Sequence, residues 1–128
     1  MHSRAIALVL VSISVPVMAQ GTANCNAKDS FETTRCFGDT FQRLDKELNR
    51  VYQELLKSLT RPAEGNLDYP AIRTRLVESQ RLWIQFRDKD CQAFIMLNGG
   101  GTAQASLHSD CLSKRTEHRI KELREWGG

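Results

Sequence analysis

Apolar residues recur along residues 37–59 in alternating steps of four and three, which places them on one side of a helix. This stripe consists of Phe37, Phe41, Leu44, Leu48, Val51, Leu55 and Leu59, widened by Tyr52 and Leu56. Asp29 or Ser30 is a suitable N-cap, and Glu32 stands three residues after Asp29, as in a capping box. Because Pro62 disfavours helix at the residue before it, the first helix is predicted to end near Thr60.

A second helix is predicted from near Asp68 to about Leu97. Pro70 suits its first turn, because proline lacks an N–H group and the N–H groups of a first turn have no partner within the helix. Its inward positions are Ile72, Leu76, Trp83 and Phe86. Residues 61–68 form the connecting loop, and the glycines of residues 98–101 end the second helix. A third helix follows, with its inward positions at Leu107, Leu112, Thr116, Ile120 and Leu123. No segment alternates with a period of two for long enough to predict a strand, so the chain is predicted to be all-α, a three-helix antiparallel bundle.

Several large or polar side chains on these helices have predicted structural roles. Trp83 and Phe86 are three residues apart, share one helical face and are interpreted as core anchors. Asn49 lies beside the apolar stripe and is interpreted as a buried hydrogen-bonding residue that fixes the helix register. Trp126, near the C-terminal end, either covers the core or remains partly exposed as a contact surface.

The first nineteen residues have the pattern of a secretory signal peptide. Arg4 precedes an apolar stretch from Ala5 to Val15, and small residues before Gln20 predict cleavage after Ala19. The stretch is shorter than the roughly 20 residues of a spanning helix, so we expect no membrane span after cleavage. We therefore divide the chain into a signal peptide, residues 1–19, and a helical domain, residues 20–128. The mature domain is expected in the periplasm of a bacterium or secreted from the cell.

Four cysteines, an even number in a small exported domain, predict two disulfide bonds. They are Cys25, Cys36, Cys91 and Cys111. Four cysteines allow three connectivities. We favour Cys25 with Cys36 and Cys91 with Cys111, because each pair closes a short loop; crossed pairings remain open.

Charge and residue spacing argue against nucleic-acid binding and against catalysis. The formal net charge is +3, and Arg4 is the only charged residue before Gln20, so the domain carries +2, with acids and bases interleaved. Asp88 and Asp90 are two residues apart and point to different helical faces. His108 and His118 lie near opposite faces of the third helix, which disfavours a metal site. We expect no enzyme activity, no metal and no cofactor.

The charged residues of the second and third helices are interpreted as structural instead. We expect Arg87 or Arg119 to form an ion pair across helices with Asp45, Asp88 or Asp90.

A combined pattern of residues resembles one known family. It includes the run Trp83-Ile84-x-Phe86-Arg87-Asp88 and the cysteine order, together with Asn49, Tyr52, Arg119 and the glycine-rich turn. The chain is similar over nearly its whole mature length to the lysozyme inhibitor LprI-like N-terminal domain family. Gly38-Asp39-Thr40 departs from that pattern and is expected to loosen the first helix.

The resemblance implies a protein partner, with a lysozyme as the candidate, that is occluded rather than chemically altered. A protruding loop would present backbone N–H groups or cations to the cleft. The predicted binding loop is Asn98, Gly99, Gly100 and Gly101, with charge from Arg61 or Lys89; alternatively, the glycines only permit a tight turn. A second hypothesis is an envelope adaptor or toxin-immunity module that binds through a helix face. The oligomeric state remains open.

Overall fold

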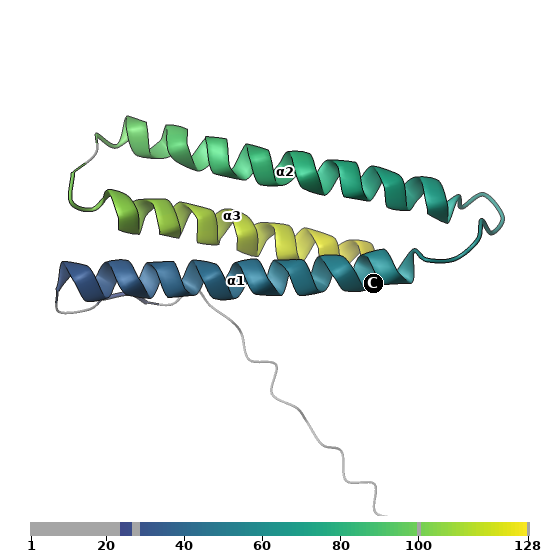
Figure 1. Ribbon diagram of the computed structural model, residues 1–128, viewed down its shortest axis with the longest axis horizontal. Helices are drawn as coiled ribbons and strands as arrows, with labels where there is room; N and C mark the ends of the chain where they lie inside the picture. The colour runs from purple at the N-terminus through teal and green to yellow at the C-terminus, as the bar shows by residue number, and fades with distance from the viewer. Residues whose placement is uncertain (1–23, 27–28, 100, 128) are drawn as a thin grey trace, which may run out of the picture.

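The computed structural model describes residues 24–26, 29–99 and 101–127. Three helices follow one another: α1 (Ser30–Ser58), α2 (Tyr69–Leu97) and α3 (Gln104–Gly127). They run in antiparallel succession, so that α1 and α3 point the same way and α2 lies opposed to both (Figure 1). Within the described ranges there is no strand, and only an isolated bridge joins Glu64 to Leu67 in the connector. The predicted all-α, three-helix antiparallel bundle is confirmed.

The helix boundaries are those that the local sequence signals predict. Asp29 caps α1 by accepting a hydrogen bond from the Glu32 N–H at 2.8 Å. Asp68 caps α2 in the same way through the N–H of Ala71 at 3.0 Å, with proline in the first turn. Helix α1 continues without interruption through Gly38, so the expected loosening at that point is wrong. Packing of the long apolar stripe outweighs the helix propensity of one glycine, which costs only about 1 kcal/mol.

The apolar core lies chiefly between α1 and α3. Its members are Leu44, Leu48, Val51, Leu55 and Leu56 from α1, Leu76 from α2, and Ile120 and Leu123 from α3. Tyr52 and Trp83 are partly buried against it. Helix α2 buries two polar side chains, Gln80 and Arg87, beside the apolar Tyr69, Leu76 and Cys91. Polar contacts therefore help to hold α2 in place, whereas the contact between α1 and α3 is mainly apolar.

Three residues predicted to face the core are exposed instead. Phe86 is 56% exposed, and Ile72 is also exposed. The inward face of α2 passes through Arg87 instead, and adjacent helical residues are rotated by about 100°, which directs Phe86 outward. Asn49 is exposed, so it does not fix the register from within the core. In each case the residue lies beside the buried face of its amphipathic helix and not on it.

Two disulfide bonds join the preferred pairs. Cys25 and Cys36 have a Cα–Cα distance of 5.6 Å, and Cys91 and Cys111 one of 5.7 Å. The first bond ties the segment before α1 to that helix, and the second ties α2 to α3. The start of α1, the end of α2 and the start of α3 meet at one end of the bundle (Figure 1). The preferred connectivity is confirmed.

The predicted signal peptide, residues 1–19, lies outside the described residues. Among the helices that the structure describes, none has the length and apolar composition needed to cross a membrane.

Loss of the Cys91–Cys111 bond is predicted to lower the free energy of unfolding by about 3 kcal/mol, because the unfolded chain regains the entropy of an open loop. The double substitution Cys91→Ala/Cys111→Ala removes it, and guanidinium unfolding followed by circular dichroism measures the change. The matched control is Cys25→Ala/Cys36→Ala, which should cost less because that bond joins no two helices. Equal losses for the two double variants would contradict the prediction.

Candidate functional site

The most connected polar residue of the bundle is Arg87, whose side chain is only 7% exposed. Its Nη1 donates to Asp45 Oδ1 on α1 at 2.8 Å and to Thr116 Oγ1 on α3 at 3.2 Å. Its Nε donates to Asp88 Oδ1 at 3.0 Å. One guanidinium thus links all three helices, which confirms the expected ion pair across helices.

Trp83 lies close to two buried arginines. The Cζ of Arg87 is 5.4 Å from the Trp83 ring centroid, and that of Arg119 is 5.8 Å away. Arg119 also donates from Nε to Gln80 Oε1 at 3.0 Å and from Nη1 to Glu122 Oε2 at 2.9 Å. These contacts give Trp83, Arg87 and Arg119 structural roles, since each guanidinium already has acceptors and an aromatic neighbour.

The two aspartates near the end of α2 have separate partners. Asp88 accepts from Arg87, whereas Asp90 forms an ion pair with Arg115 of α3, with a nitrogen–oxygen distance of 2.6 Å. They therefore do not form a shared carboxylate pair that could act as acid and base. In residues 24–26, 29–99 and 101–127, no group of three or more His, Cys, Asp or Glu side chains is arranged to hold a metal ion.

A groove of about 710 Å³ lies between α2 and α3, and we call it the α2–α3 groove. Helix α2 contributes three aromatic side chains, and α3 contributes a row of charged ones. The lining residues are Trp83, Phe86, Phe94, Asp110, Cys111, Lys114, Arg115, His118, Arg119 and Glu122. Its volume is within the range of small-ligand sites, and it is the largest of the hollows described on this surface.

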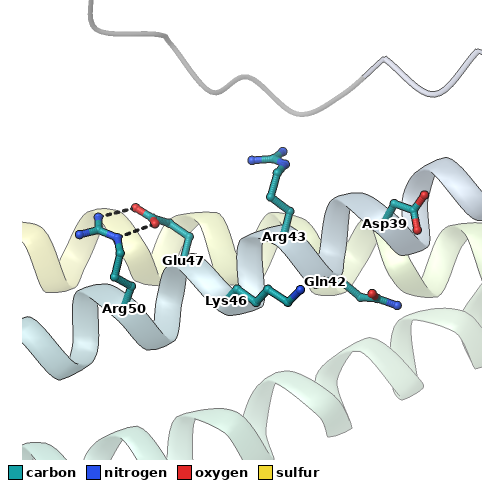
Figure 2. A pocket seen from close by; sticks show the side chains of 6 residues that line it. All are labelled: Asp39, Gln42, Arg43, Lys46, Glu47 and Arg50. Carbon is teal, nitrogen blue, oxygen red and sulfur yellow. Dashed lines mark hydrogen bonds and ion pairs between the residues drawn. The ribbon is translucent and has the colours of Figure 1, made fainter.

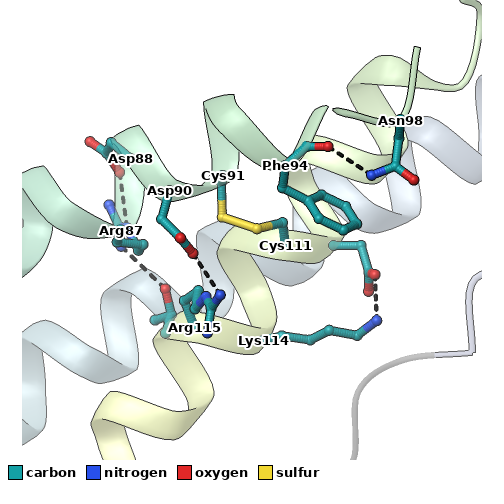
Figure 3. Close-up of a disulfide and its surroundings, with 11 residues drawn as sticks. Arg87, Asp88, Asp90, Cys91, Phe94, Asn98, Cys111, Lys114 and Arg115 are labelled. Atoms are coloured by element: carbon teal, nitrogen blue, oxygen red, sulfur yellow. Dashed lines mark hydrogen bonds and ion pairs between the residues drawn. A yellow bond between two sulfur atoms is a disulfide. The ribbon is translucent and has the colours of Figure 1, made fainter. Parts of the chain in front are cut away.

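The disulfide-bearing part of the α2–α3 groove is shown in Figure 3. The ring of Phe94 projects from α2 toward α3 beside Cys111, and Lys114 and Arg115 extend along the α3 side. Lys114 forms an ion pair with Asp110, with a nitrogen–oxygen distance of 2.6 Å. The Cys91–Cys111 bond thus fixes the spacing of the two walls of the groove where Phe94 enters it.

The predicted binding loop follows directly after α2. Asn98 Nδ2 donates to the carbonyl oxygen of Phe94 at 2.7 Å, so this side chain closes the helix end. Gly99 and Gly101 have φ angles of 77° and 102°, which other residues rarely adopt, and Gly100 lies outside the described residues. The two glycines are thus required by the backbone path, whether or not the turn also binds a partner.

The other proposed sources of loop charge lie apart from this turn. Arg61 stacks on the Tyr69 ring, with its Cζ 4.1 Å from the centroid, and Lys89 is exposed on α2.

The residues beside the turn carry a signal that the sequence interpretation missed. Met96 is 81% exposed and Leu97 is 87% exposed, higher fractions than those of the other large apolar side chains described. Phe31 is exposed at the start of α1, at the same end of the bundle. We call Phe31, Met96 and Leu97 the apolar tip. The apolar run of residues 94–97, which is longer than one helical face needs, was the available clue.

A charged hollow on α1 is shown in Figure 2. Glu47 accepts from Arg50 Nε at 2.8 Å and also pairs with Arg124 of α3. The hydrogen bond from Arg50, aided by the nearby positive charge of Arg124, lowers the pKa of Glu47 from its ordinary value. Arg43 and Lys46 extend from the same surface (Figure 2). This hollow is shaped by ion pairs on the surface and adds a tie between α1 and α3.

The sequence profile described as lysozyme inhibitor LprI matches residues 23–123. The chain belongs to the LprI family. An uncharacterized protein of Rhizobium meliloti (strain 1021) is 28% identical over 126 residues, which cover 94% of this chain and 91% of that protein. No solved structure matches the chain significantly.

In this LprI family member, most motif residues from the sequence serve the packing of α2. Trp83, Arg87 and Arg119 form one buried network, and Asp88 assists it. Gln80 belongs to the family pattern but had no predicted role, and it is buried as the acceptor for Arg119. Its place seven residues before Arg87, on the same helical face, was the signal that could have identified it.

Asp45→Asn is predicted to lower the free energy of unfolding by about 1–2 kcal/mol, because the buried Arg87 guanidinium loses its carboxylate on α1. Urea unfolding at neutral pH measures the change. Asp39→Asn is the matched control on the same helix, since its 3.8 Å pair with Arg35 is exposed and should contribute less than about 0.5 kcal/mol. The cross-helix role of Arg87 is rejected if the two variants lose equal stability.

Glu47→Gln is predicted to lower stability at pH 7 and to lose this effect in acid. A carboxyl group whose pKa is lowered by folding stabilises the native state above its unfolded pKa. That contribution disappears as the pH falls through the folded pKa, which lies below the ordinary glutamate value. Urea unfolding of both proteins across the acid range measures the difference. A gap that stays constant down to the lowest pH would contradict the assignment.

Proposed function

We propose that this protein is exported and inhibits a cell-wall hydrolase of the lysozyme type by covering its active-site cleft. Two findings support this proposal. The chain belongs to a lysozyme inhibitor family over most of its length, and both disulfide bonds are typical of an oxidising compartment outside the cytoplasm. On this proposal residues 1–19 are a signal peptide cleaved after Ala19, and the protein acts without catalysis.

The apolar tip is the contact surface that we propose for the hydrolase. Met96 and Leu97 are almost fully exposed beside the turn, and this single observation supports the choice of surface most directly. Large exposed apolar side chains gain free energy when a partner removes them from water, and a few such residues often dominate an interface. The start of α1 and the end of α2, which carry the tip residues, lie at the same end of the bundle (Figure 1).

The covalent structure near the tip favours binding by a rigid surface. The Cys91–Cys111 bond joins α2 to α3 close to the turn, and Asn98 closes the helix end with its side chain. A segment that is ordered before binding loses less conformational entropy when it binds. The Gly99 N–H donates to the Met96 carbonyl oxygen at 3.4 Å. The hydrolase cleft contains two catalytic carboxylates, so the backbone N–H group of Gly101 would face suitable acceptors there.

A second candidate function is an adaptor or toxin-immunity module that binds through the exposed face of α2. Seven of the ten large apolar residues found exposed in the described structure belong to this helix. They are Ile72, Leu82, Ile84, Phe86, Phe94, Met96 and Leu97. A long helix with this much exposed apolar surface is typical of protein contacts.

The proposal predicts that the purified mature protein slows wall lysis by a lysozyme at a near-stoichiometric ratio. The double substitution Met96→Ser/Leu97→Ser should weaken inhibition at least about tenfold, the effect of losing 1.4 kcal/mol of binding free energy. Turbidity of a wall suspension at increasing inhibitor concentration measures the inhibition constant.

Leu82→Ser is the matched control, because Leu82 is also an exposed leucine of α2 but lies about four helical turns from the tip. It should leave inhibition unchanged. Absence of inhibition by the wild-type protein at large excess would reject the proposal in favour of the adaptor. Stronger loss from Leu82→Ser than from the tip variant would instead place the hydrolase on the middle of α2.

A further inference from the structure

We propose that the α2–α3 groove is a binding site for a short neutral oligosaccharide, such as an oligomer of N-acetylated amino sugars. This site is separate from the apolar tip, and the proposal does not depend on inhibition of a hydrolase. It follows from three features of the groove: the exposed aromatic rings, the balanced charges of the α3 wall and the length.

The aromatic side of the groove resembles a stacking platform. Phe86 and Phe94 are exposed although they are large and apolar, and Trp83, three residues before Phe86, is partly buried. Phe94 is held beside the disulfide, with its ring facing the α3 side chains (Figure 3). The C–H faces of pyranose rings are apolar and pack on aromatic rings, which lose contact with water when they do so.

The α3 side of the groove offers donors and acceptors in balance. Lys114 pairs with Asp110, and Arg115 pairs with Asp90, in each case with a nitrogen–oxygen distance of 2.6 Å. Glu122 similarly pairs with Arg119 at 2.9 Å. Such a wall has almost no net charge, so it gives little attraction to a phosphate or an acidic peptide.

The same pairs suit a neutral ligand that is rich in hydroxyl and acetamido groups. Carboxylates accept hydrogen bonds from hydroxyl groups, and lysine and guanidinium groups donate to hydroxyl and carbonyl oxygens. A sugar can therefore bind without separating the ion pairs. The apolar face of a helix, or of a second copy of the chain, would instead cover these charges and remove their water, at a substantial cost in free energy.

The dimensions favour an oligomer over a single sugar. Trp83 and Phe94 are separated by about three helical turns, or roughly 16 Å along α2. Trp83 and Phe94 stand at the two ends of this span, and Phe86 lies about 4.5 Å along the helix from the Trp83 end. An extended chain of sugars would contact several aromatic rings at once, whereas a single sugar would contact about one aromatic ring.

Fluorescence provides a direct test because the chain contains two tryptophans. In Trp126→Phe, Trp83 is the remaining tryptophan and reports on the groove. Trimers and tetramers of β-1,4-linked N-acetylglucosamine are titrated into this variant, with no hydrolase present. We expect a saturable change in Trp83 emission, tighter for the tetramer. Glucose oligomers of the same linkage should bind more weakly, because they lack the acetamido group.

Two further substitutions separate the groove from the rest of α2. In the Trp126→Phe background, Phe86→Ala should weaken oligosaccharide binding at least about tenfold, since an aromatic platform is lost. Leu82→Ala is the matched control: it also truncates an exposed apolar residue of α2, but one that does not line the groove. It should leave the titration unchanged. Urea unfolding of both variants confirms that they are folded.

The outcomes distinguish this proposal from the other possible occupants. No saturable change with any of the amino-sugar oligomers overturns it, whatever the hydrolase assay shows. If the Trp126→Phe protein binds no sugar and Phe86→Ala abolishes hydrolase inhibition, the groove is assigned to a protein partner. Conversion of a dimer to a monomer by Phe86→Ala, measured by light scattering, assigns it to a second copy of the chain.

Discussion

The buried guanidinium of Arg87 is the interaction on which the three-helix arrangement depends. It reaches an acceptor on α1 and another on α3 from its place on α2, and it stacks near the Trp83 ring. Apart from this guanidinium, α2 is held by the apolar contacts of Leu76, Val77 and Trp83 and by the Cys91–Cys111 bond. A charge buried in this way must keep its partners, so the network also selects one register for α2.

The unequal packing of the helices explains where the unpartnered surfaces lie. Helices α1 and α3 share most of the apolar core, so their stripes are covered and their outer faces are polar. Helix α2 uses arginine and glutamine for its inward contacts, and many of its apolar side chains remain in water. Both proposed binding surfaces, the apolar tip and the α2–α3 groove, follow from this difference.

The disulfide between Cys91 and Cys111 connects stability with these surfaces. It joins the two walls of the groove and lies close to the turn that carries the apolar tip. A small bundle with a modest core gains much of its rigidity from such a bond, since the open chain loses conformational freedom. The same restraint holds the exposed aromatic and aliphatic groups in position before any partner arrives.

The sequence by itself determined the helices, their caps and the class of fold, because these depend on local spacing and on single residues such as Asp29 and Asp68. Short loop separations also predicted the disulfide pairs. The tertiary structure alone decided which side of α2 faces inward, since its stripe is wide and mixes apolar residues with a buried arginine. Phe86 therefore lies in a groove and not in the core, and Asn49 lies in solvent. A helix of this kind has several faces that could be buried, and only packing against its neighbours selects among them.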